Sequence, residues 1–320
     1  MELTLHPDGT ATGAQPSIVT VGMFDGLHRG HRFLLSTLAA EASARRLRPV
    51  ALTFDRHPLS LIDPLRSPAM LAPLPDRLRM MASCGCTPGV IRFDEPTRRL
   101  SAHRFMEELR LRLGAQVLLM GFNHRLGHDR LSTPDEYRRA ADSAAIEVMF
   151  ATGYPHHFGG APISSSAIRA ALAEGDVRLA AEMLGRDYAL SGTVVGGKQL
   201  GRTIGFPTAN ISVEPPEMLI PAYGVYAARA TLDSGAVYPA MVNIGVRPTV
   251  DMTESPTVSV EAHLLGYEGD LYGSRVALDL VERMRAEMRF SSVDELRARL
   301  QADASAARAI LSAEPDKEMP

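Results

Sequence analysis

The sequence predicts an α/β domain with a doubly wound parallel sheet, followed by an antiparallel β domain that ends in a helix. From about residue 17 to residue 183, short aliphatic or β-branched runs alternate with longer helical stretches, as is typical of a parallel sheet covered by helices. After Leu184 the runs are short, are separated by glycine and proline, and have no helices between them, which is typical of an antiparallel barrel or sandwich. We therefore expect one domain at residues 1–184 and a second at residues 185–320.

Each expected element follows from its local pattern. The strands expected in the first domain are residues 17–22, 49–54, 89–93, 116–120 and 146–151, and residues 101–113 are expected to be helical. The strands expected in the second domain are residues 192–195, 223–230, 236–245, 257–265 and 275–281. The last amphipathic segment, residues 292–311, predicts a helix with Ser292 as its N-cap and Glu295 completing a capping box.

Composition limits the classes of protein that fit. The 320 residues are 45% hydrophobic and 22% charged, which suits a globular chain with two cores. A net charge of −3 excludes the broad basic surface of a nucleic-acid-binding protein, so we expect small-molecule partners and no nucleic acid. No run approaches the roughly 18 apolar residues that span a bilayer, and no basic-then-apolar leader is present, so we expect no membrane association and a cytoplasmic location. The sequence does not indicate an oligomeric state.

Cysteine and lysine usage exclude further chemistry. Cys84 and Cys86 are separated by one glycine and form neither a disulfide framework nor a four-ligand zinc site, so we expect them to be inert. The only lysines are Lys198 and Lys317. The first half of the chain therefore has no lysine nucleophile and no P-loop lysine.

The first expected strand runs directly into a glycine-rich turn that carries two histidines. The turn reads Gly22-Met23-Phe24-Asp25-Gly26-Leu27-His28-Arg29-Gly30-His31, and a helical pattern begins near its end. Such a turn presents unpaired backbone N–H groups and the positive end of a helix dipole to an anion, and its glycines let a phosphate approach the backbone. His28 and His31 are three residues apart, so both rings are expected on one face, where imidazole can donate hydrogen bonds to phosphate oxygens. The turn therefore predicts a phosphoryl- or nucleotidyl-transfer site.

Two other interpretations of the histidine pair are open. Two surface histidines beside an ordinary turn would leave Gly26 and Gly30 unexplained. A metal site formed by His28, His31 and His57 lacks an acidic or cysteine partner at ligand spacing.

Two later segments of the first domain also have the chemistry of a nucleotide site. In Ile163-Ser164-Ser165-Ser166-Ala167-Ile168-Arg169, Ser164 can cap a helix and Arg169 can present its guanidinium to phosphate one turn later, although a plain capped helix is also consistent. The loop Gly121-Phe122-Asn123-His124-Arg125-Leu126-Gly127 follows the fourth strand, at a carboxyl end where doubly wound sheets bind ligands.

These three segments resemble the nucleotidylyltransferase superfamily. Residues 22–31 resemble its H-x-G-H signature, and residues 163–169 resemble its second signature. Residues 121–127 resemble a glycine-bounded loop of the superfamily, although His124 and Leu126 replace the usual aromatics. His57-Pro58 also matches a family element. The resemblance implies transfer of a nucleoside monophosphate from a triphosphate to a phosphate acceptor. It implies that His28 and His31 stabilise the transition state and that Arg169 holds the triphosphate. The further binding residues that it implies are Gly22, Phe24, Asp25, Gly26, Gly30, Asn123, Ser164 and Ser165.

The second domain begins with a near match to a P-loop. Gly192-Thr193-Val194-Val195-Gly196-Gly197-Lys198-Gln199 has Gln199 in place of the required hydroxyl residue, and no helical pattern follows the lysine, so we reject a P-loop. The run that follows is Gly201-Arg202-Thr203-Ile204-Gly205-Phe206-Pro207-Thr208-Ala209-Asn210. Its glycines can offer backbone donors to phosphates, and Thr208 and Asn210 can offer oxygen ligands to Mg²⁺ once nucleotide phosphates complete the shell.

This run resembles riboflavin kinase, whose hallmark is a glycine-rich stretch that ends in Pro-Thr-Ala-Asn. The match continues through residues 243–249, 260–265 and 268–273 and the segment with Arg285, Glu287 and Phe290, although Gly266 replaces a usual acidic residue. Glu261 shares a strand face with Ser259 and His263. Alone it would suit a solvated face, but the resemblance implies that it is the general base that takes a proton from the ribityl hydroxyl. The resemblance also implies binding roles for Gly196, Gly201, Arg202, Gly205, Pro207, Asn243 and Arg285, with Thr208 and Asn210 on magnesium.

Together the resemblances cover about residues 16–311, and the chain is similar to the bifunctional riboflavin kinases and FMN adenylyltransferases, the prokaryotic-type FAD synthetases. The resemblance implies a β-barrel second domain, Mg²⁺ as cofactor, ATP as co-substrate, and riboflavin and FMN as substrates. The expected reactions are phosphorylation of riboflavin to FMN and adenylylation of FMN to FAD with release of pyrophosphate. The alternatives are a transferase of the same superfamily with another acceptor, and a non-catalytic or single-activity flavin-binding protein with a decayed adenylyltransferase site.

Overall fold

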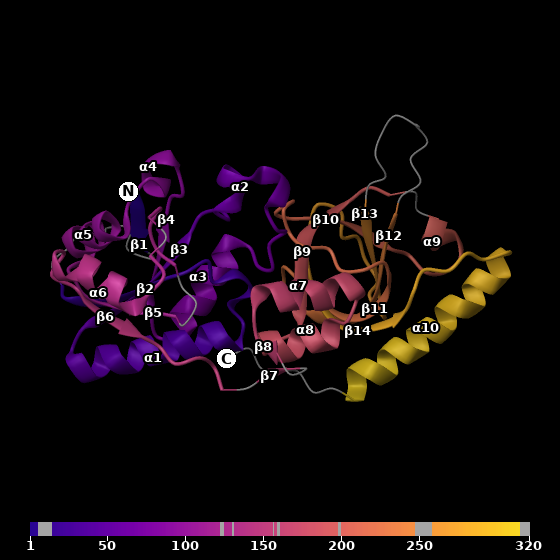
Figure 1. Cartoon of the computed structure of the whole chain (residues 1–320). Coiled ribbons are helices and arrows are strands. Elements are labelled where there is room, and N and C mark those ends of the chain that lie inside the picture. Colours follow the sequence, from indigo (N-terminus) through magenta and orange to yellow (C-terminus); the bar gives the residue numbers. More distant parts are fainter. Residues whose placement is uncertain are drawn as a thin grey trace. The chain divides into compact units, whose positions relative to one another are not determined.

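The computed structural model describes residues 1–5, 15–121, 125–129, 131–155, 157–158, 161–197, 200–246 and 258–313. The chain forms two compact units, Met1–Ser164 and Ser165–Pro320 (Figure 1). This division precedes the expected boundary after residue 184, because α7 (Ser165–Glu174) and α8 (Val177–Leu184) belong to the second unit, where α8 contacts the barrel. No helix in the described ranges is long and apolar enough to cross a membrane.

The first unit is built on a sheet whose central strands are parallel. In the described residues its order is β1-β4-β3-β2-β5-β6, and only β1 is antiparallel to its neighbour. The strands are β1 (Leu3–Leu5), β2 (Ser17–Val21), β3 (Arg48–Phe54), β4 (Thr87–Ile91), β5 (Ala115–Met120) and β6 (Glu147–Phe150). The order reverses at β2, whose carboxyl end leads into the histidine turn. This is the topological switch point at which doubly wound sheets bind ligands.

Helices cover both faces of this sheet. Ile18 of β2 packs with Leu35 and Met81 on one side, whereas Val19 packs with Phe105 on the other, because successive strand side chains point to opposite faces. The α-helices are α1 (Arg29–Arg45), α2 (Leu59–Ile62), α3 (Leu74–Ser83), α4 (Glu95–Arg98), α5 (Ala102–Leu113) and α6 (Pro134–Asp142). The short elements are η1 (Asp25–Leu27), η2 (Pro64–Arg66), β7 (His157–Phe158) and β8 (Ala161–Pro162). The prediction of a doubly wound layer is confirmed, with β1 added at one edge.

The second unit contains a closed antiparallel barrel, as predicted. Its order is β10-β13-β12-β11-β14-β9. The strands are β9 (Tyr188–Val195), β10 (Ala209–Val213), β11 (Gly224–Leu232), β12 (Val237–Val246), β13 (Val258–Leu264) and β14 (Arg275–Arg285). β10 was expected to be part of a loop, but it pairs with β9 and β13 and so places Asn210 inside the sheet.

One detail around the rejected P-loop differs from expectation, and another supports the rejection. A one-turn helix, α9 (Leu200–Thr203), does follow the lysine, although none was predicted. Gly192, which would begin the P-loop, lies instead in β9, where a Cβ atom would come 2.0 Å from the carbonyl oxygen of Ser212. The glycine therefore permits close approach of two strands, and this supports the rejection.

The final helix, α10 (Val293–Ala313), packs on the outside of the barrel against β11, β12 and β14 (Figure 1). Ser292 Oγ accepts a hydrogen bond from Glu295 N at 3.2 Å, as expected of an N-cap. The Glu295 carboxylate accepts instead from Ser291 N at 2.8 Å, so the predicted capping box closes one residue earlier.

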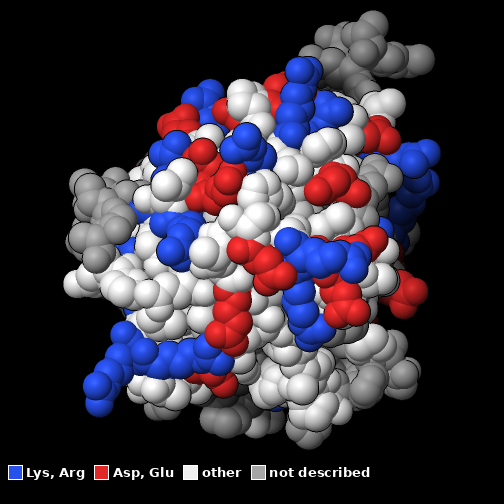
Figure 2. Space-filling view, turned by 60° about the vertical axis from the view of Figure 1, so that its left-hand side comes forward, with Lys and Arg blue, Asp and Glu red and all other residues white. Residues whose placement is uncertain are grey.

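The surface carries many local ion pairs. Arg98 and Glu95 lie 2.7 Å apart, and Arg112 and Glu108 lie 2.6 Å apart, each pair within one helical turn. On the face shown in Figure 2, basic and acidic side chains are interspersed. Exposed pairs of this kind each contribute only about 0–1 kcal/mol to stability.

Candidate active sites

The histidine turn brings its two imidazoles into contact. His28 is the N-cap of α1, and its Nδ1 accepts a hydrogen bond from His31 N at 3.2 Å. The two rings stack, with centroids 3.6 Å apart and planes 15° apart. The spacing therefore places both rings on one face at a helix N-terminus, which is the arrangement expected of an anion site.

The glycines of the turn make room for side chains as well as for a ligand. A Cβ atom on Gly30 would lie 3.2 Å from the His28 ring, and one on Gly22 would lie 3.1 Å from the Phe24 ring. Phe24 is buried and meets the edge of the His31 ring at a centroid distance of 5.3 Å. Gly26 has a φ of 75°, in the left-handed region that favours glycine. Gly22 and Phe24 thus support His31, a role that the sequence did not reveal.

Asp25 holds the turn in place, a role different from the predicted binding contact. It is 2% exposed, and its Oδ1 accepts hydrogen bonds from the backbone N–H groups of Leu71 at 2.9 Å and Ala72 at 3.3 Å. These bonds fasten the turn to the segment before α3. Its predicted role as a ligand contact stays a prediction.

Arg77 of α3 is a further anchor that the sequence did not identify. Its guanidinium is 1% exposed and donates to Met23 O at 2.8 Å, Thr53 Oγ1 at 2.6 Å and Phe54 O at 3.2 Å. Burial lowers its pKa, an effect opposed by the carboxylates of Asp25 and Asp55. A charged donor inside the unit thus ties the turn to the end of β3.

The surroundings of His31 favour its neutral form. Burial lowers its pKa well below the usual 6.5, and the neighbouring His28 lowers it further. Its Nδ1 is buried and has no hydrogen-bond partner among the described residues. The neutral ring can therefore offer a hydrogen bond to a bound phosphate, whereas a protonated ring is not expected before a ligand binds.

The lowered pKa of His31 predicts a loss of stability in mild acid. Below a pH of about 6.5 the unfolded chain protonates this histidine while the folded chain does not, so the free energy of unfolding falls as the pH drops towards the folded-state pKa. Above that pH His31 is neutral in both states and does not change the free energy of unfolding with pH. We expect the melting temperature of His31→Gln, followed by circular dichroism, to fall less than that of the wild type between about pH 7 and pH 5. His128→Gln, which removes an exposed histidine, serves as the control; equal slopes for the wild type and His31→Gln would contradict the prediction.

The other residues predicted to form the nucleotide site of the first domain have fewer described contacts. His57 Nδ1 accepts from Leu59 N at 3.2 Å, and the described residues contain no group of three or more His, Cys, Asp or Glu that could hold a metal ion. Asn123 and His124 lie outside the described residues. Ser164 immediately precedes α7 and is the last residue of the first compact unit. Ser165 and Arg169 lie one turn apart on α7, in the second unit. Their predicted roles stay predictions.

The two cysteines have properties expected of inert thiols. Both are free, and Cys86 is buried. Burial raises the pKa of Cys86 to about 12, with a smaller contribution from Cys84. A thiol with such a pKa is protonated and unreactive near neutral pH.

In the barrel, residues predicted from separate motifs lie side by side. Glu261 of β13 is directly opposite Asn210 of β10 on one side and Asn243 of β12 on the other. Thr208 Oγ1 lies 3.5 Å from Glu261 Oε2, to which it donates. A carboxylate, a hydroxyl and two amides therefore meet at one level of three neighbouring strands.

The segment before β10 is fixed from both sides. A Cβ atom on Gly201 would lie 2.2 Å from Phe206 O, and Phe206 N donates to Gly201 O at 2.8 Å, which closes a tight turn. Gly205 has a φ of 84°. His263 Nδ1 contacts Pro207 O at 2.7 Å. His263, missed as a functional residue, thus holds the Pro-Thr-Ala-Asn segment beside Glu261.

The glycines before this segment also differ in role. A Cβ atom on Gly197 would lie 2.1 Å from Asn210 Nδ2, so this glycine makes room for Asn210. Gly196 borders open space, consistent with its predicted binding role. Arg202 lies on α9, but its side chain is outside the description.

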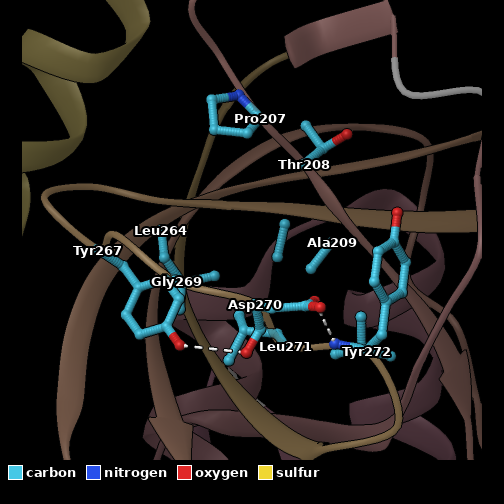
Figure 3. Close-up of a pocket in the computed structure, with 11 residues that line it drawn as sticks. Pro207, Thr208, Ala209, Leu264, Tyr267, Gly269, Asp270, Leu271 and Tyr272 are labelled. Carbon is cyan, nitrogen blue, oxygen red and sulfur yellow. Dashed lines mark hydrogen bonds between the residues drawn. The ribbon is translucent and has the colours of Figure 1, made fainter.

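Thr208 borders two cavities. The larger, of about 280 Å³, contains Glu261, Thr208 and Asn243 and has a mainly apolar wall. That wall is formed by Ile204, Phe206, Val225, Met241, Met288, Phe290, Leu296 and Leu300. The smaller, of about 70 Å³, is bordered by Thr208, Tyr267, Asp270 and Tyr272 (Figure 3). Asp270 Oδ1 accepts from Tyr272 N at 3.0 Å, which shapes this loop.

Arg285 borders the larger cavity, and each of its three guanidinium nitrogens also contacts the protein. Nε and Nη2 lie 2.9 and 2.7 Å from Asp303 Oδ2, and Nη1 donates to Ala286 O at 3.0 Å. Arg285 therefore helps to hold the cavity wall, and its predicted contact with flavin stays a prediction.

Comparison with known proteins agrees with this architecture. Residues 11–167 match the family model for FAD synthetase, and residues 184–311 match that for riboflavin kinase. A crystal structure titled a macrolide-efflux protein from Streptococcus pneumoniae superposes with a TM-score of 0.82 at 29% identity, covering 93% of this chain and 95% of that one. The chain is thus a two-domain transferase of the nucleotide-using type.

Curated relatives identify the family. "Bifunctional riboflavin kinase/FMN adenylyltransferase" from Escherichia coli (strain K12) is 37% identical over 293 residues, 91% of each chain. Proteins of the same name from Pseudomonas fluorescens and Bacillus subtilis (strain 168) are 34% and 31% identical, covering 92% and 90% of each chain. The chain belongs to the bifunctional riboflavin kinase/FMN adenylyltransferase family.

Proposed function

We propose that the chain phosphorylates riboflavin with ATP to give FMN and then adenylylates FMN with a second ATP to give FAD and pyrophosphate. The observation that carries this proposal is the cluster of Thr208, Asn210, Asn243 and Glu261, of which Thr208, Asn243 and Glu261 border the larger cavity. The family relationship supports the pairing of this kinase site with an adenylyltransferase.

The two cavities suggest where the kinase substrates bind. The larger cavity has aromatic and aliphatic walls suited to the flat isoalloxazine ring. The smaller, bordered by Tyr267 and Tyr272 and sharing Thr208 with the larger, has a volume of about 70 Å³ and could take only part of the nucleotide. The terminal ribityl hydroxyl would then lie near Glu261, which takes its proton as the hydroxyl oxygen attacks the γ-phosphorus and ADP leaves.

The donor set around Thr208 fits Mg²⁺. The Thr208 hydroxyl and the Asn210 amide oxygen are hard, neutral ligands beside the Glu261 carboxylate, and such a set binds Mg²⁺ weakly unless ATP phosphates complete the shell. When bound, the ion would neutralise charge on the phosphate oxygens. Asn210 is 7% exposed, so its orientation is set by the sheet before ATP arrives.

In the adenylyltransferase reaction, an oxygen of the FMN phosphate attacks the α-phosphorus of ATP in line. A bond forms between that oxygen and the α-phosphorus, the bond from the α-phosphorus to the oxygen that bridges to the β-phosphorus breaks, and pyrophosphate leaves with that oxygen. The stacked His28 and His31 at the N-terminus of α1 donate hydrogen bonds to the phosphate that gains charge. Arg169, with Ser164 and Ser165, would hold the triphosphate, and Asn123 would contact substrate. No covalent enzyme intermediate is required, since the acceptor phosphate is already a nucleophile.

A single assay tests the proposal. The protein is incubated with riboflavin, ATP and Mg²⁺, and the flavins are separated chromatographically; FMN and then FAD are expected. Tight riboflavin binding without either product would favour a non-catalytic flavin-binding protein. Because both reactions consume ATP, we also propose that the enzyme acts in the cytoplasm.

A further inference from the structure

Asp303 is a buried carboxylate on α10 that borders neither cavity. It is 2% exposed and lies one helical turn before Ala307, which packs against Ala227 of β11 and Met241 of β12. Removing a carboxylate from water is costly unless the charge is paired. The position of Asp303 therefore needs partners that are themselves well placed.

Two arginines pair with Asp303. Arg285, at the end of β14, reaches Oδ2 with Nε at 2.9 Å and Nη2 at 2.7 Å. Arg299, one turn earlier on α10, places Nε 3.0 Å from Oδ1. The Arg285 guanidinium also donates to Ala286 O and lies 5.9 Å from the centre of the Phe290 ring. Arg285 is thus fixed on several sides, and Asp303 supplies its ion-pair partner.

The pair of Asp303 and Arg285 joins two walls of the larger cavity. The chain after Arg285 contributes Met288 and Phe290 to one wall. The helix that carries Asp303 contributes Leu296 and Leu300 to another. The distance between these apolar walls therefore depends on the contact of Arg285, which borders the cavity, with Asp303, which does not.

We propose that Asp303 is a positioning residue for riboflavin binding, which acts through Arg285 to hold Phe290 and α10 at the spacing that accepts a flavin ring. The inference rests on the proposed kinase function. Asp303 touches neither the substrate nor the cluster around Glu261, so its loss should weaken riboflavin binding without slowing phosphoryl transfer once riboflavin is bound.

The full-length Asp303→Asn variant tests this inference. With ATP and Mg²⁺ saturating, we expect the KM for riboflavin in FMN formation to rise about tenfold, equivalent to about 1.4 kcal/mol, with kcat nearly unchanged. The affinity for riboflavin without ATP, measured by quenching of flavin fluorescence, is expected to fall by a similar factor. FAD formation from supplied FMN is expected to be unchanged.

A matched control separates positioning from general destabilisation. Asp187→Asn removes another aspartate of the same unit, one whose side chain is 8% exposed, pairs with Arg229 at 3.3 Å and borders neither cavity. We expect it to retain the wild-type KM. If Asp303→Asn does not fold, Arg299→Gln removes only the outer partner of Asp303 and should give a smaller rise in KM.

Wild-type KM and riboflavin affinity in Asp303→Asn, or an equal rise in Asp187→Asn, would overturn the proposal. A failure of the proposed function is distinguishable, because the wild type would then form no FMN. In that case the fluorescence measurement of riboflavin affinity still tests Asp303.

Discussion

Replacing Glu261 by glutamine is expected to lower the rate of FMN formation by roughly 10²–10⁴-fold, the contribution typical of a positioned general base. Glutamine has nearly the same shape and can still accept a hydrogen bond from Thr208, so the cluster with Asn210 and Asn243 should persist. What is lost is the carboxylate that takes the proton of the ribityl hydroxyl. FAD formation from supplied FMN should be unchanged, and chromatography of the flavins measures both rates.

Glu214→Gln is the matched control for this variant. Glu214 belongs to the same unit, is partly exposed, pairs with Arg275 at 3.4 Å and borders neither cavity. It should retain full kinase activity. A Glu261→Gln enzyme that forms FMN at the wild-type rate would exclude Glu261 as the base, and equal loss of both products would contradict the division of the two reactions.

The main elements of the fold were predictable where hydrophobic patterns are strong. All five strands expected in the first domain are present, and β2, β3 and β5 were the easiest to predict because they are mainly buried, apolar runs. β1 has only three residues and gains its stability by pairing with β4, so no local pattern marks it. β10 was hidden because its first residues belong to the Pro-Thr-Ala-Asn motif, and only pairing with β9 and β13 makes them a strand.

The residues that carry the chemistry of the sites were easier to predict than the residues that hold them in position. The motifs identified Glu261, Thr208 and Asn210, but their proximity depends on how the barrel closes, which no local pattern specifies. A motif also does not distinguish a residue that touches a ligand from one that supports such a residue. Asp25 was therefore predicted to bind the nucleotide, although its carboxylate holds backbone N–H groups. Asp303 belongs to no motif and becomes visible only through its buried pairing with Arg285.

Replacing His28 by asparagine is expected to stop FAD formation while FMN formation continues. Asparagine is a good N-cap, so its side-chain oxygen can replace Nδ1 as the acceptor for His31 N and keep the start of α1 intact. The imidazole that stacks on His31 is lost, and with it a donor to the reacting phosphate. Removing one such donor typically lowers kcat by roughly 10²–10³-fold. The measurement is the rate of FAD formation from FMN and ATP.

Comparison with His28→Ala separates the two roles of this residue. Alanine removes the cap as well as the imidazole, so His28→Ala should lose about 1 kcal/mol more stability than His28→Asn. If the imidazole acts on phosphate, both variants lose FAD formation to the same extent although their stabilities differ. If activity instead follows stability, so that asparagine restores FAD formation, His28 is a helix cap and the reacting phosphate must be stabilised by other groups.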